Sequence, residues 1–304
     1  MRDIQNVYII GLGAIGGAYG SRIMENCPET LKVLVGGSRF ENYTKNGVSV
    51  NGKEIRFKYV KPGSTEEKAD LIMIAVKNHH LEQTIRDIGP LVGPDTIILS
   101  LLNGITSEEM IGGVFGMDKM LYSFCVATDA VREGTNISFS NIGKVVFGDR
   151  DNSAASDKVK AVKAYFDRVK LPYTVPQDIL RELWWKFMLN VGVNQISAIL
   201  RAPYGRFARE GYARDLMTDA SREVINIAQK AGVHLTEEDI QEYIRIISTL
   251  SPEGKTSMLQ DVEAGRKTEV EIFSGTVCDL GKKYGIPTPM NDLLFRLIRA
   301  IEDS

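Results

Sequence analysis

The hydrophobic residues of this chain follow two different patterns, and the change falls near residue 177. Before that position, short apolar runs such as 70–76 and 95–102 alternate with polar helical stretches and with turns rich in glycine and asparagine. Such alternation is typical of strands and helices that build an open, mostly parallel sheet. After that position, apolar residues recur at helical spacing almost throughout. We therefore expect an α/β domain at residues 1–177 and an all-α domain at residues 178–304.

The same pattern predicts the bounds of the individual elements. The predicted strands are 4–10, 31–35, 48–50, 54–60, 70–76, 95–102, 122–127, 143–148 and 173–175, with a helix near 154–169. The predicted helices of the second domain are 178–201, 209–232, 236–249, 258–265, 268–285 and 289–302. Asn51-Gly52 between two strands predicts a type I′ hairpin inserted in the connections of the sheet. Thr236 marks a helix start, and Gly232 and Gly285 mark helix ends.

A glycine-rich turn directly follows the first predicted strand. It reads Gly11-Leu12-Gly13-Ala14-Ile15-Gly16, and a helical pattern comes next. In this context the first glycine permits a tight turn, the second lets backbone approach a pyrophosphate, and the third lets the helix pack close to the strand. The helix N-terminus offers N–H groups and a partial positive charge to phosphates. The motif therefore predicts that these six residues bind a dinucleotide.

The residues after the second predicted strand bear on which dinucleotide binds. NAD-selective sites carry an acidic residue there, which binds the ribose 2′-hydroxyl. Here the strand is followed by Gly-Gly-Ser38-Arg39, and the first acidic residue is Glu41. A guanidinium beside a hydroxyl suits a 2′-phosphate through charge-assisted hydrogen bonds. Ser38 and Arg39 therefore predict NADP, and the alternative is an ordinary solvated arginine in a loop.

Polar residues follow two of the buried strands. Lys77 comes after the strand at 70–76, and Asn103 comes after the strand at 95–102. In open α/β sheets, ligands bind beyond the carboxyl ends of the parallel strands. Lys77 and Asn103 are therefore candidates to line the nicotinamide end of the site. Ordinary loop polarity explains Lys77 equally well and Asn103 less well.

The predicted helix at 178–201 carries three polar side chains among large apolar ones. Lys186, Asn190 and Asn194 are spaced i, i+4 and i+8, so they lie along one stripe of a helix. Burying the two amides without partners would cost about 1–3 kcal/mol each, so the stripe must face polar groups. Satisfied hydrogen bonds at a helix packing interface are one explanation. The other is the wall of a substrate cleft, in which the Lys186 ammonium supplies a proton.

Two more polar residues occur later in the helical domain. They are Ser257, in Ser-Met-Leu-Gln-Asp, and Glu269, which follows Thr268. Ser257 could donate to a carboxylate or cap a helix, and Glu269 could bind a substrate hydroxyl or pair with a lysine. Physical chemistry alone favours the cap and the surface ion pair.

Composition narrows the classes of function. The 304 residues include 37 Lys and Arg against 39 Asp and Glu, which gives no electrostatic case for nucleic acid or an anionic membrane surface. Three dispersed cysteines and three histidines show neither a disulfide framework nor metal-ligand spacing, which favours a reducing compartment. The N-terminus lacks a signal-peptide pattern, and no apolar run reaches the roughly 18 residues that span a bilayer. We expect a cytoplasmic protein without a metal, a nucleic-acid partner or a membrane partner.

Along nearly its full length the chain resembles the ketopantoate reductase (2-dehydropantoate 2-reductase) family. The motifs that carry this resemblance are GLGAIGG at 11–17, VK at 76–77, NG at 103–104, K-x-x-x-N-x-x-x-N at 186–194, SMLQD at 257–261 and TE at 268–269. The resemblance implies a Rossmann-type dinucleotide-binding domain followed by a helical domain like that of 6-phosphogluconate dehydrogenase. It also implies NADPH-dependent reduction of ketopantoate to pantoate, a step of pantothenate and coenzyme A biosynthesis.

The resemblance also implies roles for single residues. Lys186 matches the general acid, and Glu269 matches an acidic residue of the active site on its cofactor side. The remaining matches are substrate contacts at Asn190, Asn194 and Ser257, and cofactor-side residues at Lys77 and Asn103. One position departs from the family pattern, because Tyr204 stands where the family often has an asparagine that contacts the substrate. The identity of the 2-keto acid therefore stays open.

Other functions remain open at this point. One is an NADP-dependent reductase of another 2-keto acid. A second is a 3-hydroxyacid dehydrogenase, which also uses a K-x-x-x-N helix but has a glycine-rich run where this chain has Arg-Glu-Leu-Trp-Trp at 181–185. A third is a non-enzymatic NADP-binding sensor, which would not need a lysine on the face of the cleft. The sequence also leaves the oligomeric state open, with a homodimer among the options.

The residues after the second strand generate a prediction about the cofactor. NADPH should be preferred over NADH, and Arg39→Ala should weaken NADPH binding by about 1–3 kcal/mol, as expected for a charge-assisted hydrogen bond. Titration calorimetry of both dinucleotides with both proteins measures the effect. Equal kcat/KM for NADPH and NADH in the unmodified protein would contradict the assignment.

Overall fold

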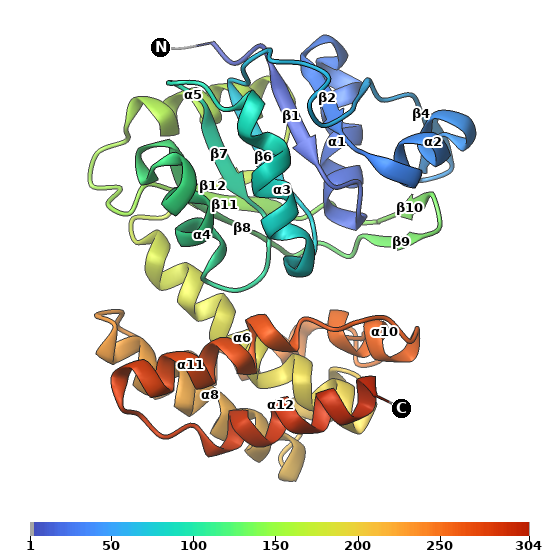
Figure 1. Cartoon of the computed structure of the whole chain (residues 1–304). Helices are drawn as coiled ribbons and strands as arrows, with labels where there is room; N and C mark the ends of the chain where they lie inside the picture. Colours follow the sequence, from blue (N-terminus) through green and yellow to red (C-terminus); the bar gives the residue numbers. More distant parts are fainter. Residues whose placement is uncertain (1–2, 304) are drawn as a thin grey trace. The chain divides into compact units, whose positions relative to one another are not determined.

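The computed structural model describes residues 3–303. The chain divides into two compact units, Met1–Ile179 and Leu180–Ser304. The first unit is a sheet flanked by helices, and the described residues of the second unit form helices only (Figure 1). The assignment of dinucleotide binding to residues 1–177 and of catalysis to residues 178–304 stays a prediction.

The first unit contains an eight-stranded sheet in the order β12-β11-β8-β7-β6-β1-β2-β5. Its strands are β1 (Val7–Ile10), β2 (Leu31–Leu34), β5 (Tyr59–Val60), β6 (Leu71–Ile74), β7 (Ile97–Ser100), β8 (Met120–Val126), β11 (Lys144–Gly148) and β12 (Tyr173–Thr174). Along the sheet, neighbouring strands are parallel from β5 through β2, β1, β6 and β7 to β8. The next strand, β11, runs antiparallel to β8. The chain builds outward from β1 in both directions, so the end of β1 is the switch point at which such sheets bind ligands.

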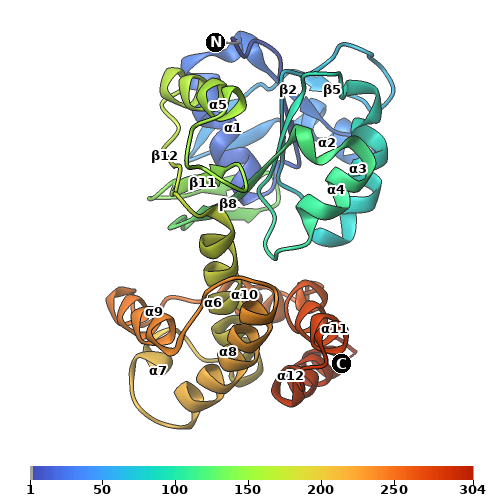
Figure 2. The ribbon, with the colours of Figure 1, turned by 90° about the vertical axis from the view of Figure 1, so that its left-hand side faces the viewer.

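Helices cover both faces of this sheet (Figure 2). The helices of the first unit are α1 (Ala14–Asn26), α2 (Gly37–Asn46), α3 (Leu81–Ile88), α4 (Ser107–Phe115) and α5 (Asp157–Arg168). Successive strand residues point to opposite faces. Accordingly, Ile9 packs with α1 and α5, whereas Tyr8 and Ile10 pack with α3 and α4.

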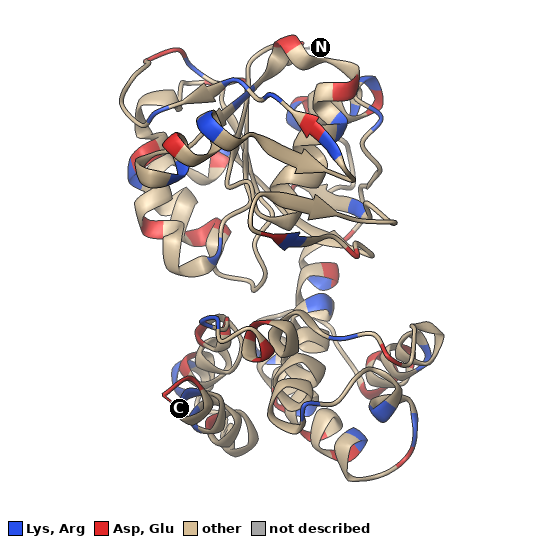
Figure 3. Cartoon of the chain, turned by 90° about the vertical axis from the view of Figure 1, so that its right-hand side faces the viewer, with Lys and Arg blue, Asp and Glu red and all other residues tan. Residues whose placement is uncertain are grey.

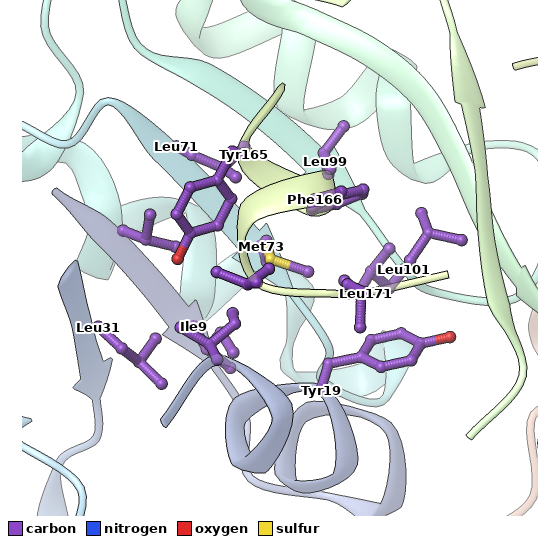
Figure 4. Close-up of a cluster of buried hydrophobic side chains, with 14 of the residues drawn as sticks. Ile9, Tyr19, Leu31, Leu71, Met73, Leu99, Leu101, Tyr165, Phe166 and Leu171 are labelled. Atoms are coloured by element: carbon purple, nitrogen blue, oxygen red, sulfur yellow. The ribbon is translucent and has the colours of Figure 1, made fainter. Parts of the chain in front are cut away.

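The core under α1 and α5 is tightly filled with aromatic and aliphatic side chains (Figure 4). Tyr19 of α1 and Tyr165 and Phe166 of α5 are at most 2% exposed. They pack against the central strands, including Ile9 and Met73. Burying side chains of this size contributes about 1.5–3 kcal/mol each, which holds the first residues of α1 against the end of β1.

A second sheet of four strands contains the predicted hairpin. Its strands, in the order β4-β3-β10-β9, are β3 (Val48–Val50), β4 (Lys53–Ile55), β9 (Val131–Glu133) and β10 (Asn136–Ser138). The hairpin at Asn51-Gly52 is confirmed, because β3 and β4 pair antiparallel and both turn residues have positive φ, as a type I′ turn requires. Its predicted place is also confirmed, because β3 and β4 lie between β2 and β5 along the chain, within a connection of the large sheet. In addition, β3 pairs with β10, which was not predicted.

The predicted bounds of one strand are wrong, and several elements were not predicted. The strand predicted at 54–60 ends at Ile55, and Tyr59–Val60 instead joins β2 in the large sheet. Between the two strands Phe57 is buried against Gly20, and the strands on either side of it pair in different sheets. The helices α2, α3 and α4 and the strands β9 and β10 were not predicted, because they are short, and a period is read from windows longer than any of them.

The second unit follows the predicted helices more closely. Its helices are α6 (Ile179–Leu200), α7 (Gly205–Ala208), α8 (Tyr212–Lys230), α9 (Glu237–Thr249), α10 (Ser257–Glu263), α11 (Ser274–Tyr284) and α12 (Pro289–Glu302). Thr236 begins α9 with a capping box to Asp239, and Gly285 ends α11 in the left-handed conformation. The helix predicted at 209–232 begins only after Gly211, whose φ of 136° is not helical. The helix predicted at 268–285 is replaced by a short 3₁₀ turn at 270–272 and then α11.

Residues of both charges occur along the chain in each unit. Lysine and arginine alternate with aspartate and glutamate along the helices and loops of both (Figure 3). Within residues 3–303, no helix has both the length and the apolar character that crossing a membrane requires.

The packing of α1 on the sheet generates a prediction about stability. A Cβ atom on Gly16 would overlap the carbonyl oxygen of Gly11, so Gly16→Ala should lower the free energy of unfolding by about 1–3 kcal/mol. Gly113→Ala is the matched control, because its Cβ would meet no atom within 4 Å and alanine favours the helix α4 by up to about 1 kcal/mol. Urea denaturation measures both. A Gly16→Ala protein as stable as the Gly113→Ala protein would contradict the packing argument.

Candidate functional site

The glycine-rich turn lies at the carboxyl end of β1 and packs closely on the end of β6. Gly11 has a φ of +96°, and a Cβ there would lie 2.6 Å from the Ala75 carbonyl oxygen and 2.9 Å from Val76 Cγ1. Gly13 is different, because the nearest atom to its Cβ position would be the Ala75 oxygen at 3.8 Å. The turn is therefore closed on the side of β6 and leaves room for a ligand at Gly13.

The helix α1 begins directly after this turn and presents its first N–H groups there. Gly13 is the N-cap residue, and no side chain caps the helix. The first N–H groups of a helix have no partner within the helix, and the helix dipole adds partial positive charge. Since Leu12 is buried while Gly13, Ala14 and Ile15 are partly exposed, backbone donors are available to an anion.

A pocket of about 540 Å³ adjoins the turn. Gly11 and Leu12 line one part of it, and Arg39 and Tyr43 of α2 and Lys61 line another. The alternative explanation placed Arg39 in a loop, and this placement is wrong, because Arg39 lies in the first turn of α2. Ser38 is exposed on the same turn. Two cations that line the same pocket suit a phosphate group.

Sequence reasoning missed most of the pocket residues, among them Tyr43, Lys61 and His80. They come from α2, from the loop after β5 and from the residues before α3, which only the fold brings together. Burial and then the charges of His79 and Arg39 lower the pKa of His80 below its usual value. The lowered pKa keeps this imidazole neutral near pH 7, so it offers a ring face and one acceptor nitrogen to a ligand.

Lys77 and Asn103 follow neighbouring parallel strands. Ile74 of β6 is paired with Ser100 of β7, so the two polar residues each lie three positions beyond a paired residue. They therefore occur at the same edge of the sheet as the glycine-rich turn, as predicted.

The loop that carries Asn103 is closed by a buried polar network. The hydroxyl oxygens of Ser100 and Ser107 lie 2.7 Å apart across the base of the loop. Ser107 donates to Glu108 Oε2 at 2.9 Å, and Ser123 donates to the Ser100 carbonyl at 2.8 Å. Since Ser100 and Glu108 are at most 1% exposed, these bonds are shielded from water and fix the loop.

The polar stripe of the second unit lies on α6. Asn194 Nδ2 donates to Asn190 Oδ1 at 3.4 Å, and these residues are 5% and 8% exposed. Lys186 lies one turn earlier and is partly exposed. The ring centroids of Trp184 and Phe187 are 6.0 Å apart, edge to face, beside it. The helical spacing predicted for this stripe is confirmed, and the roles of its residues stay predictions.

Ser257 is the first residue of α10 and is exposed. The cap of α10 is Thr256 instead, whose hydroxyl accepts from the Leu259 N–H at 3.2 Å, so the capping explanation of Ser257 is wrong. Thr256 also donates to the Ser197 hydroxyl at 3.0 Å. Because Ser197 belongs to α6, this bond holds the start of α10 against α6.

In the second unit Glu269 is buried and Tyr204 is partly buried. Glu269 is 7% exposed, so the interpretation as a surface ion pair does not fit its position. The preceding residue, Thr268, is held to α12 by two hydrogen bonds of 2.7 Å to Glu302.

Tyr204 packs on the core cluster that contains Val193 of α6, and burial raises the pKa of its phenol. Within the described part of the chain, no three His, Cys, Asp or Glu side chains are grouped as metal ligands.

Known proteins are similar to this chain along almost all of its length. A family model described as "Ketopantoate reductase PanE/ApbA" matches residues 7–152, and one described as "Ketopantoate reductase PanE/ApbA C terminal" matches residues 178–302. The 2-dehydropantoate 2-reductase of Aquifex aeolicus (strain VF5) is 26% identical over 98% of this chain and 97% of its own.

Two solved structures extend the comparison. The ternary structure of D-mandelate dehydrogenase with NADH and anilino(oxo)acetate has a TM-score of 0.86 at 25% identity and covers 98% of both chains. The dimeric ketopantoate reductase from Staphylococcus aureus has a TM-score of 0.78 at 19% identity, with 98% of this chain and 99% of that chain covered. The predicted fold class, a Rossmann-type α/β domain followed by an all-α domain, is confirmed.

The fixed loop after β7 generates a prediction about Asn103. Asn103→Ala should weaken dinucleotide or substrate binding by about 1–3 kcal/mol, as expected for a lost hydrogen bond, and should leave the melting temperature nearly unchanged. Calorimetric binding and thermal melting on one preparation measure both quantities. A variant that melts far below the parent and binds NADPH normally would show that Asn103 has a structural role.

Proposed function

The chain belongs to the ketopantoate reductase family of oxidoreductases, and we propose that it reduces a 2-keto acid with NADPH, ketopantoate being the first candidate. One observation carries the proposal. The chain combines a glycine-rich turn at the switch point of a parallel sheet with a lysine and two asparagines along one helix. The first feature suits a dinucleotide, and the second suits a small polar substrate that needs a proton.

The cofactor proposal rests on the fit of the first unit to a nicotinamide dinucleotide. D-mandelate dehydrogenase, a structural neighbour, holds NADH. In this chain the space at Gly13 and the N–H groups of α1 suit a pyrophosphate. Arg39 and Lys61 line the adjoining pocket and would hold a 2′-phosphate, which favours NADPH over NADH.

The proposed chemistry assigns one task to each residue of the second unit. When bound, the nicotinamide supplies the hydride that reduces the keto carbon. The Lys186 ammonium stabilises the negative charge that grows on the keto oxygen and donates a proton to it. The amides of Asn190 and Asn194 and the hydroxyl of Ser257 orient the substrate while remaining neutral.

Glu269 of the second unit and Lys77 and Asn103 of the first unit have the remaining proposed roles. The Glu269 carboxylate accepts hydrogen bonds from a substrate hydroxyl and from the ribose of the cofactor. Lys77 and Asn103, at the ends of neighbouring strands, bind the nicotinamide half of the dinucleotide. A homodimer, a cytoplasmic location and a place in pantothenate biosynthesis are parts of the same proposal, and the first is supported by the dimeric relative from Staphylococcus aureus.

A second candidate is reduction of a different 2-keto acid. Tyr204 favours it, because a bulky, partly buried phenol stands where the family often has an amide that contacts substrate. D-mandelate dehydrogenase shows that another activity occurs on this fold. The experiment that tests the proposed function is a panel of 2-keto acids, ketopantoate included, with NADPH or NADH followed at the nicotinamide absorbance. Absence of turnover with every member would overturn it.

The general-acid role generates a prediction about Lys186. Lys186→Ala should lower kcat by roughly 10²–10⁴, because the forming alkoxide loses its proton donor and its stabilising charge. NADPH affinity should stay within about twofold, since the proposed dinucleotide contacts belong to other residues. Lys230→Ala, at an exposed position near the end of α8, is the control and should change neither quantity. Activity of Lys186→Ala within about tenfold of the parent would refute the role.

A further inference from the structure

Arg132 of β9 lies against the glycine-rich turn, although 120 residues separate it from Leu12. Its Nη1 atom donates a hydrogen bond to the Leu12 carbonyl oxygen. Its Nε atom donates to the Gly134 carbonyl at 2.8 Å, and its guanidinium lies 5.5 Å from the centre of the Tyr43 ring. Three contacts from different segments therefore hold one guanidinium in a fixed orientation.

The bond to Leu12 fixes the direction of the next N–H group. The described chain has no cis peptide bond, so the Leu12–Gly13 peptide is trans. In a trans peptide the C=O and the following N–H point in opposite directions. Because the Leu12 carbonyl points toward Arg132, the Gly13 N–H points away from β9. Gly13 is also the residue of the turn that leaves room for a ligand.

The small sheet also supports the start of α1. A Cβ on Gly17 would overlap the end of the Ile137 side chain from β10, so the sheet packs directly on the first turn of the helix. No ion pair involves Arg132 among residues 3–303, and two carbonyl oxygens and an aromatic ring hold its positive charge instead. A fixed charge without a carboxylate partner raises the local potential for an anion at the turn.

We propose that Arg132 is a positioning residue for the pyrophosphate of the dinucleotide. It holds the Leu12–Gly13 peptide with the Gly13 N–H turned toward the phosphate, and it acts through Leu12 without touching the ligand. Without this bond the peptide can rotate and present its carbonyl oxygen, which repels phosphate. The inference rests on the proposed function, because it names a residue that prepares the dinucleotide site.

The test compares ligands that contain the pyrophosphate with one that lacks it. NADPH, NADH and ADP-ribose contain the pyrophosphate, whereas adenosine 2′-monophosphate has only the 2′-phosphate. Calorimetry well below the melting temperature gives the Kd of each ligand for the parent, for Arg132→Ala and for Arg132→Gln. The control is Arg56→Ala, which removes an arginine that is 89% exposed and close in sequence to β4.

We expect Arg132→Ala to weaken the binding of all three ligands that contain the pyrophosphate by the same factor. Arg132→Ala should raise their Kd by about 10- to 150-fold, the range for a lost hydrogen bond to a charged group, and leave adenosine 2′-monophosphate within about twofold. Arg39→Ala should show the opposite selectivity, with a loss for NADPH and adenosine 2′-monophosphate alone. Arg132→Gln keeps a hydrogen-bond donor without the charge, so it should raise the Kd of the same three ligands by a smaller factor. Arg56→Ala should leave every Kd unchanged.

Three outcomes would overturn the inference. They are unchanged Kd values in a folded Arg132→Gln or Arg132→Ala protein, an equal loss for all four ligands, and a loss confined to ligands with a 2′-phosphate. The second would indicate general destabilisation, and the third would indicate direct contact with the 2′-phosphate. Failure of the proposed function is a separate result, because a parent that binds NADPH and reduces no 2-keto acid leaves every one of these binding measurements valid.

Discussion

The close approach of backbone at the end of β1 is the constraint on which the first unit depends. Gly11 touches the end of β6, and Gly16 brings α1 against Gly11, so neither position has space for a side chain. That contact aims the first N–H groups of the helix at the open space beside Gly13. The large core under α1 and α5 holds the contact in place, and the small sheet supports it from the side of β9. Packing in this unit therefore holds the first N–H groups of α1 in the arrangement that the proposed phosphate site requires.

The second unit depends on a different constraint, because its helix α6 holds polar side chains among buried apolar ones. Most of α6 from Phe187 to Ala198 is buried, yet Asn190 and Asn194 are kept among its apolar residues. The amide–amide bond between them is long, at 3.4 Å, so each amide keeps capacity for a further partner. If hydrogen bonds within the protein occupied every donor and acceptor of these amides, the two asparagines would have only a structural role. This remaining capacity supports the role in substrate binding that is proposed for Asn190 and Asn194.

The sequence predicted the features with strong local signals. The glycine-rich turn, the Asn51-Gly52 hairpin and the long helix of Lys186 follow from spacing and backbone preference, and the structure contains all three. Features that depend on distant segments were not predictable in this way. Arg132 and His80 approach the turn and its pocket only after the strands pair, and the small sheet joins segments more than 80 residues apart. The strand predicted at 54–60 failed because tertiary burial of Phe57 outweighed local pattern.

Transfer of hydride to a 2-keto acid is the central claim, and isotopic labelling tests it most directly. The measurement uses NADPH deuterated at C4 of the nicotinamide, ketopantoate or another 2-keto acid from the panel, and mass spectrometry of the product. The account predicts a 2-hydroxy acid that carries one deuterium at C2, since the carbon receives the labelled hydride and the oxygen receives an exchangeable proton. A 2-hydroxy acid without deuterium at C2, or no product from any 2-keto acid, would contradict it.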